Sequence, residues 1–132
     1  MKQVLRNKDT GTPLQRYKKS FFHAVDGIIY ATRNEHNMII IILCGILAIV
    51  AGFTFKIDES EWLFIVLIIG LVSGTEMINT AIEAVVDLET IKIHPLAKIA
   101  KDTASSASLI FSIVALVGGL IIFIPKVIVL FS

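Results

Sequence analysis

The chain has 132 residues, 55% of them hydrophobic, and a mean hydropathy of +0.82. This length accommodates one domain, and so high a hydrophobic share is typical of membrane proteins. A net charge of +1 gives no reason to expect a nucleic-acid partner. The single cysteine, Cys44, excludes an internal disulfide, and the few cysteines and histidines do not suggest zinc. We therefore expect one integral-membrane domain over residues 1–132.

The N-terminal region begins with a polar segment, 1–13, which we expect to be a flexible tail. Residues 14–36 then place their apolar side chains at helical spacing and most basic side chains on the other side. This pattern predicts a basic amphipathic helix that lies in the membrane interface. A soluble helix covering a core is the alternative, but the chain has no soluble core to cover.

Three long apolar runs follow, and around them we expect transmembrane helices over 38–55, 62–86 and 104–124. The first is close to, and the other two exceed, the roughly 20 residues that a helix needs to cross about 30 Å of hydrocarbon. The short charged segment 56–61 joins the first two, and the polar segment 87–106 leads into the third. The predicted fold class is an all-α membrane protein with three transmembrane helices and an N-terminal amphipathic surface helix.

The positive charges predict the orientation of these helices. Basic residues are concentrated before residue 38 and recur in 87–106, whereas 56–61 carries one lysine against three acidic residues. Cytoplasmic segments near membrane spans are enriched in lysine and arginine. We therefore expect a multi-pass protein of the cell membrane, with the N-terminus and 87–106 on the cytoplasmic side.

A polar stripe marks the second apolar segment. Glu76, Asn79, Glu83 and Asp87 share one helical face, and a span that starts near Trp62 places the first two below the cytoplasmic membrane surface. Polar side chains at such depth usually face a polar cavity or a partner. A solvated face would leave too few apolar residues in the membrane. A polar clamp between helices remains the second alternative.

These residue types fit phosphoryl transfer to a hydroxyl held in the bilayer. Mg²⁺ prefers oxygen ligands, which Glu83 and a carboxylate from elsewhere, most obviously Glu35, would supply. Glu76 is a candidate general base toward an alcohol, and Lys101 is a candidate phosphate contact. The sequence contains no Walker motif, dinucleotide fingerprint or protein-kinase catalytic loop. Any kinase chemistry here must therefore follow an unrelated design.

Three blocks of the sequence carry a family resemblance: "RNE" at 33–35, "E-x-x-N-T-A-I-E-x-x-V-D" at 76–87 and "A-K-x-A-K-D" at 97–102. With these motifs at these spacings, the chain resembles the small integral-membrane prokaryotic diacylglycerol kinases. The versions "HPLAKIAKD" at 94–102 and "GLIIFIPK" at 119–126 are similar to the Gram-positive branch, which comprises undecaprenol kinases.

The resemblance implies a homotrimer whose active sites lie near the cytoplasmic face, between helices of neighbouring subunits. It implies Glu76 as the general base, Glu35 and Glu83 as ligands of Mg²⁺ with ATP, and Asn79 as support, with Asp87 a further supporting residue. It also implies ATP contacts and one residue near the lipid: Arg16, His23, Lys92, His94, Lys101 and Asp102 for ATP, and Ser105 for the lipid. Two departures are His23, where proteobacterial members have tyrosine, and the small residues Ala104 and Ser106.

The leading prediction is an ATP- and Mg²⁺-dependent kinase of a membrane alcohol, with undecaprenol as the acceptor and diacylglycerol as the alternative. A small ion-coupled transporter, in which Glu76 would bind a proton, is a rival from another class. It fits the polar residues less well because they gather at one end of the spans. A non-enzymatic membrane scaffold is the third alternative.

Overall fold

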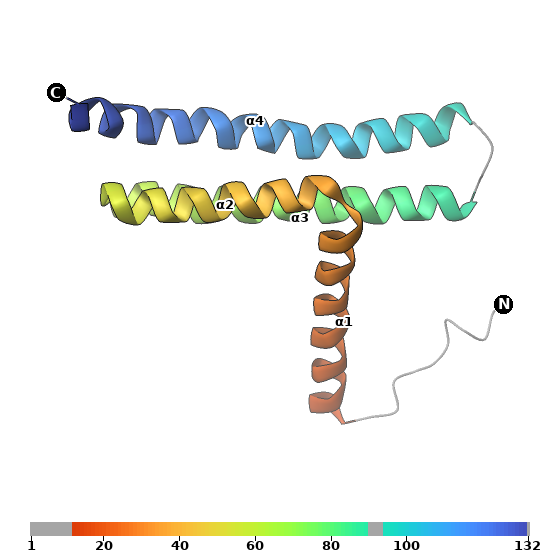
Figure 1. The fold of residues 1–132 in the computed structure, drawn as a ribbon. Coiled ribbons are helices and arrows are strands. Elements are labelled where there is room, and N and C mark those ends of the chain that lie inside the picture. Colours follow the sequence, from red (N-terminus) through yellow and green to blue (C-terminus); the bar gives the residue numbers. More distant parts are fainter. Residues whose placement is uncertain (1–11, 90–93, 132) are drawn as a thin grey trace.

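The computed structural model describes residues 12–89 and 94–131, which form four helices. In chain order these are α1 (Pro13–Asn34), α2 (His36–Phe55), α3 (Glu59–Glu89) and α4 (Pro95–Phe131). Helices α2, α3 and α4 run side by side, while α1 leaves this bundle at a steep angle (Figure 1). Each of the three bundled helices is long and apolar enough to cross a membrane.

Helix α1 has clear signals at both ends. Thr12 and Gln15 form a reciprocal capping box, and Pro13 occupies the first helical turn. At the other end, Asn34 donates from its side chain to the Tyr30 carbonyl at 2.8 Å, and Glu35 adopts an extended backbone. The helix that we expected over 14–36 therefore ends at Asn34, and the chain turns a corner before α2. Of the expected tail, residues 1–11 lie outside the described residues.

A tight turn makes α2 and α3 antiparallel. Lys56 has a left-handed backbone (φ 52°), and the amide of Ile57 donates to the Gly52 carbonyl at 3.1 Å. The next helix starts with a second capping box, in which Asp58 and Glu61 each donate a backbone amide to the other's carboxylate at 2.9 Å. The turn is closed by a buried apolar cluster that includes Ile57.

Helices α3 and α4 form an antiparallel hairpin that is tied near both ends. Glu61 and Lys126 make a half-buried ion pair of 2.9 Å near the α2–α3 turn. Asp87 and Lys101 make an ion pair of 2.6 Å near the opposite end. Because these pairs join residues far apart in the sequence, they hold the two helices in one register.

The lengths of α3 and α4 place their polar ends outside the hydrocarbon. At 1.5 Å per residue, 31 and 37 residues correspond to about 46 and 55 Å, against roughly 30 Å of bilayer core. The predicted spans 62–86 and 104–124 lie inside these longer helices. Many large apolar side chains of the bundle are exposed in the single chain, as on Leu43 and Leu116. Such exposure suits a lipid environment or further subunits.

Candidate functional site

Glu76 is the most deeply buried charged side chain among the described residues, with 2% of its surface exposed. It projects from α3 toward α4, where the Ser108 hydroxyl donates to its Oε2 atom at 2.5 Å. The other carboxylate oxygen, Oε1, is buried and has no hydrogen-bond partner. A buried oxygen without a partner is costly, so Oε1 is a natural acceptor for a group that arrives from outside.

Asn79 and Glu83 continue the polar face of α3. The Asn79 side-chain amide donates to Glu83 Oε1 at 3.1 Å, which is the (i, i+4) contact expected on a helix. Asn79 is itself buried, and its Oδ1 atom has no partner. Two unpartnered buried oxygens, one on Glu76 and one on Asn79, therefore lie one turn apart on the same helix.

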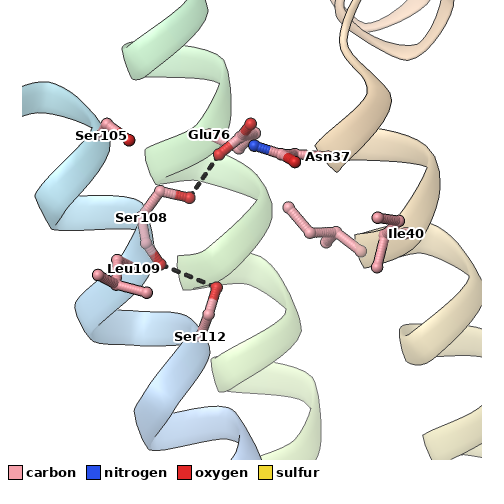
Figure 2. A pocket seen from close by; sticks show the side chains of 8 residues that line it. Asn37, Ile40, Glu76, Ser105, Ser108, Leu109 and Ser112 are labelled. Atoms are coloured by element: carbon pink, nitrogen blue, oxygen red, sulfur yellow. Dashed lines mark hydrogen bonds between the residues drawn. The ribbon is translucent and has the colours of Figure 1, made fainter. Parts of the chain in front are cut away.

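A cavity of about 310 Å³ opens beside Glu76. Figure 2 shows its polar end, where Glu76 lies between Ser108 of α4 and Asn37 of α2, and the side chain of Asn37 points toward Glu76. Ser105 also lines this cavity, as does Ser112 one turn beyond Ser108. The predicted base and the predicted lipid-side residue thus share one cavity.

The α3–α4 ends bring two further predicted residues together. Lys101 pairs with Asp87, and this hydrogen bond raises the pKa of Lys101. Desolvation acts in the opposite direction but is the smaller effect. Lys101 precedes the apolar part of α4, and its ammonium stays charged at neutral pH. Asp102 is exposed and pairs instead with Lys98 one turn earlier in the same helix.

Other predicted residues lie apart from the cavity or outside the described residues. Arg16 and His23 are exposed on α1, about 28 and 18 Å along that helix from the corner at Glu35. Glu35 is half-buried at the corner itself. His94 is exposed before α4, where its Nδ1 atom accepts from the Leu96 amide at 3.2 Å. Lys92 lies outside the described residues.

The fit to a magnesium ion can be judged from the oxygen atoms present. Residues 12–89 and 94–131 contain no group of three or more acidic, histidine or cysteine side chains that could hold a metal alone. Mg²⁺ commonly takes only one or two carboxylates and completes its shell with water and substrate phosphates. The Glu83 carboxylate, beside the unpartnered Asn79 Oδ1, fits such a partial site.

Sequence reasoning missed three polar residues of the cavity, Ser108, Ser112 and Asn37, as well as its apolar residues Ile40, Ile41 and Leu109. A signal existed for the serines, because Ser105, Ser108 and Ser112 recur at spacings of three and four, which places them on one helical face. Asn37 immediately precedes the first apolar segment, and nothing local to it indicated that α2 would pack beside Glu76.

Three apolar helices, with a buried carboxylate beside a cavity that polar side chains line, define a small integral-membrane protein. Residues 22–123 match the family model of prokaryotic diacylglycerol kinase. The chain is 42% identical over 120 residues to the undecaprenol kinase of Bacillus subtilis (strain 168), covering 91% of this chain and 98% of that protein.

Two further relatives are named diacylglycerol kinases. That of Helicobacter pylori (strain J99) is 38% identical, covering 73% of this chain and 75% of its own. That of Pseudomonas aeruginosa is 29% identical, covering 75% and 80%. The chain therefore belongs to the prokaryotic diacylglycerol kinase family. It is a membrane lipid kinase, kinase activity implies ATP as the phosphoryl donor, and the transporter and scaffold alternatives are set aside.

Proposed function

We propose that this lipid kinase phosphorylates undecaprenol, with Glu76 as the general base. The observation that carries the proposal is the Oε1 atom of Glu76, which is buried, unpartnered and at the edge of a cavity between α2, α3 and α4. The acceptor is chosen because the relative that aligns with 91% of this chain is named undecaprenol kinase. Diacylglycerol is the alternative acceptor, since other relatives carry that name.

In the proposed reaction, Glu76 Oε1 accepts the proton of the lipid hydroxyl. The alkoxide oxygen then forms a bond to the γ-phosphorus of ATP, the bond from that phosphorus to the bridging oxygen breaks, and ADP leaves. The hydrogen bond from Ser108 occupies Oε2, so Oε1 is the oxygen left for the acceptor. Positioning of this base within hydrogen-bond reach of the hydroxyl is the requirement for general base catalysis.

Most of the remaining predicted residues are assigned to the nucleotide and its metal ion. Glu83 and Glu35 would hold Mg²⁺ together with the ATP phosphates, and Asn79 would support that site. Bound Mg²⁺ supplies neutralisation of phosphate charge. The residues proposed to contact ATP beside the metal site are Arg16, His23, Lys92, His94, Lys101 and Asp102. Asp87 would hold Lys101 in place through their ion pair, and Ser105 would lie toward the lipid.

We further propose a homotrimer in which α1 lies on the cytoplasmic membrane surface. The exposed aromatic side chains of α1, Tyr17, Phe21 and Phe22, would enter the interface. Because Arg16 and His23 lie far along α1 from the Glu76 cavity of their own chain, they would serve a site of a neighbouring subunit. Chemical crosslinking in membranes should give a ladder that ends at trimer, and a ladder that ends at dimer would contradict this assembly.

Reconstituted protein, supplied with ATP and Mg²⁺, should transfer labelled phosphate to undecaprenol when undecaprenol and diacylglycerol are offered side by side. Glu76→Gln should lose transfer by roughly a hundredfold or more, while nucleotide binding is retained. The matched control is Glu59→Gln, which makes the same change from carboxylate to amide at the exposed first residue of α3. Transfer to diacylglycerol alone would establish the alternative acceptor, and an active Glu76→Gln enzyme would remove the base assignment.

A further inference from the structure

The Glu76 cavity continues into an apolar groove, which is lined by α2, α3 and α4 next to that cavity and by α2 and α4 farther on. A second cavity, of about 300 Å³, shares Ile40, Ile41 and Ser112 with the first. A third, of about 450 Å³, shares Cys44, Ala48 and Ala115, among others, with the second. Because each cavity shares lining residues with the next, the three form one path, which we call the tail groove.

The tail groove is about as long as the hydrocarbon core of a bilayer is thick. Its α4 side extends from Ser105 to Ile124, about 28 Å at 1.5 Å per residue, against roughly 30 Å of hydrocarbon. Beyond Ser112 its named lining is apolar apart from the thiol of Cys44. Small residues form much of its wall, with Gly45 and Ala48 on α2 facing the same space as Ala115 and Gly119 on α4.

We propose that the tail groove holds the apolar tail of the acceptor lipid, and that Ala48 and Ala115 set the thickness of tail that it admits. The inference rests on the proposed function. A lipid alcohol whose hydroxyl reaches the unpartnered Oε1 of buried Glu76 must place its tail next to that hydroxyl, and the groove is continuous with that point.

The selectivity of such a groove comes from shape rather than from hydrophobicity. The bilayer outside is as apolar as the groove, so moving a tail between them changes van der Waals contacts and steric fit, not exposure to water. Small side chains at Ala48 and Ala115 leave room for a chain with branching methyl groups. A larger side chain at either position would narrow the path without touching Glu76.

Cys44 provides a reporter inside the groove, because it is the single cysteine of the chain and lines both apolar cavities. In the full chain reconstituted in nanodiscs, undecaprenol should slow alkylation of Cys44 by a membrane-permeant maleimide about tenfold at saturation. The matched control is Leu43→Cys in a Cys44→Ser background, which is one residue away and exposed, as Cys44 is, but is not part of the groove. There undecaprenol should leave the labelling rate unchanged.

A second measurement uses transfer kinetics. Ala115→Leu should raise the KM for undecaprenol about tenfold while kcat stays within about twofold, as expected when a bulkier side chain takes space from an apolar tail. Ala107→Leu, exposed on the same helix and outside the groove, should change neither constant. Thermal melting of both variants checks that the fold is kept.

The outcomes separate the two proposals. Protection of Cys44 by undecaprenol without phosphate transfer would refute undecaprenol as the acceptor. It would still support the tail groove as a binding site for a lipid tail. Transfer without protection of Cys44, or equal protection at positions 43 and 44, would overturn the groove assignment. Efficient oxidation to Cys44–Cys44 dimers in the presence of undecaprenol would also overturn it, because a second copy would then occupy the groove.

Discussion

Glu76 and Ser108, 32 positions apart, are joined by a hydrogen bond in the buried part of the α3–α4 hairpin. The hydroxyl donates to one carboxylate oxygen and leaves the other at the edge of the cavity. This contact both ties two helices together and determines which oxygen of Glu76 is available to an acceptor.

Ser108→Ala should lower kcat for lipid phosphorylation by roughly tenfold, because Glu76, the proposed base, loses the hydrogen-bond donor that orients its carboxylate. Ser108→Thr keeps a hydroxyl and should restore most of the rate. Ser106→Ala is the control, since its hydroxyl is exposed and donates to a carbonyl of its own helix. A Ser108→Ala enzyme with normal kcat would show that the contact serves packing only.

Lys101→Met should raise the KM for ATP by roughly tenfold, because a charge-assisted contact to phosphate is lost. Asp87→Asn should raise the KM for ATP less, since the Lys101 ammonium is still present and only loses the ion pair that holds it in position. Lys56→Ala, in the turn at the opposite end of the bundle, is the control. Equal KM values in all three variants and the parent chain would place Lys101 outside the nucleotide site.

Gly118→Ala should destabilise the hairpin by roughly 1–3 kcal/mol, which is the usual cost of overpacking. A β-carbon at Gly118 would lie 2.1 Å from the Cζ atom of Phe64, whereas at Gly119 it would meet no heavy atom within 4 Å. Thermal melting in detergent should therefore fall for Gly118→Ala and not for Gly119→Ala. Adding Phe64→Leu to Gly118→Ala should recover part of the loss, and its failure to do so would exclude the clash as the cause.

Lys56→Gly should stabilise the protein by about 1 kcal/mol, because the left-handed backbone at this position favours glycine. Lys56→Ala removes the same charge but keeps the β-carbon, so its melting temperature should stay near that of the parent. If both variants melt alike, the charge rather than the backbone conformation governs the turn.

Much of the helical framework could be read from local patterns. Apolar segments of membrane-crossing length predicted three helices, and the helical period placed Glu76, Asn79 and Glu83 on one face, because both features depend only on nearby residues. A break between the surface helix (14–36) and the first span (38–55) was expected, but the exact residue of the corner, Glu35, escaped prediction, because residues 32–37 are all polar and nothing in them marks where the first helix ends. There the side chain of Asn34 bonds back to its own helix and the backbone becomes extended.

The sequence by itself determined the membrane class, the helical segments and the residue types available for phosphoryl transfer. Only the tertiary structure decided that Ser108 meets Glu76, that Lys101 pairs with Asp87, and that small residues of α2 and α4 help to line an apolar groove leading away from Glu76. The physical reason is the separation along the chain of the residues that interact. Helix formation follows from local periodicity, whereas these contacts join distant segments and depend on how the helices pack against one another.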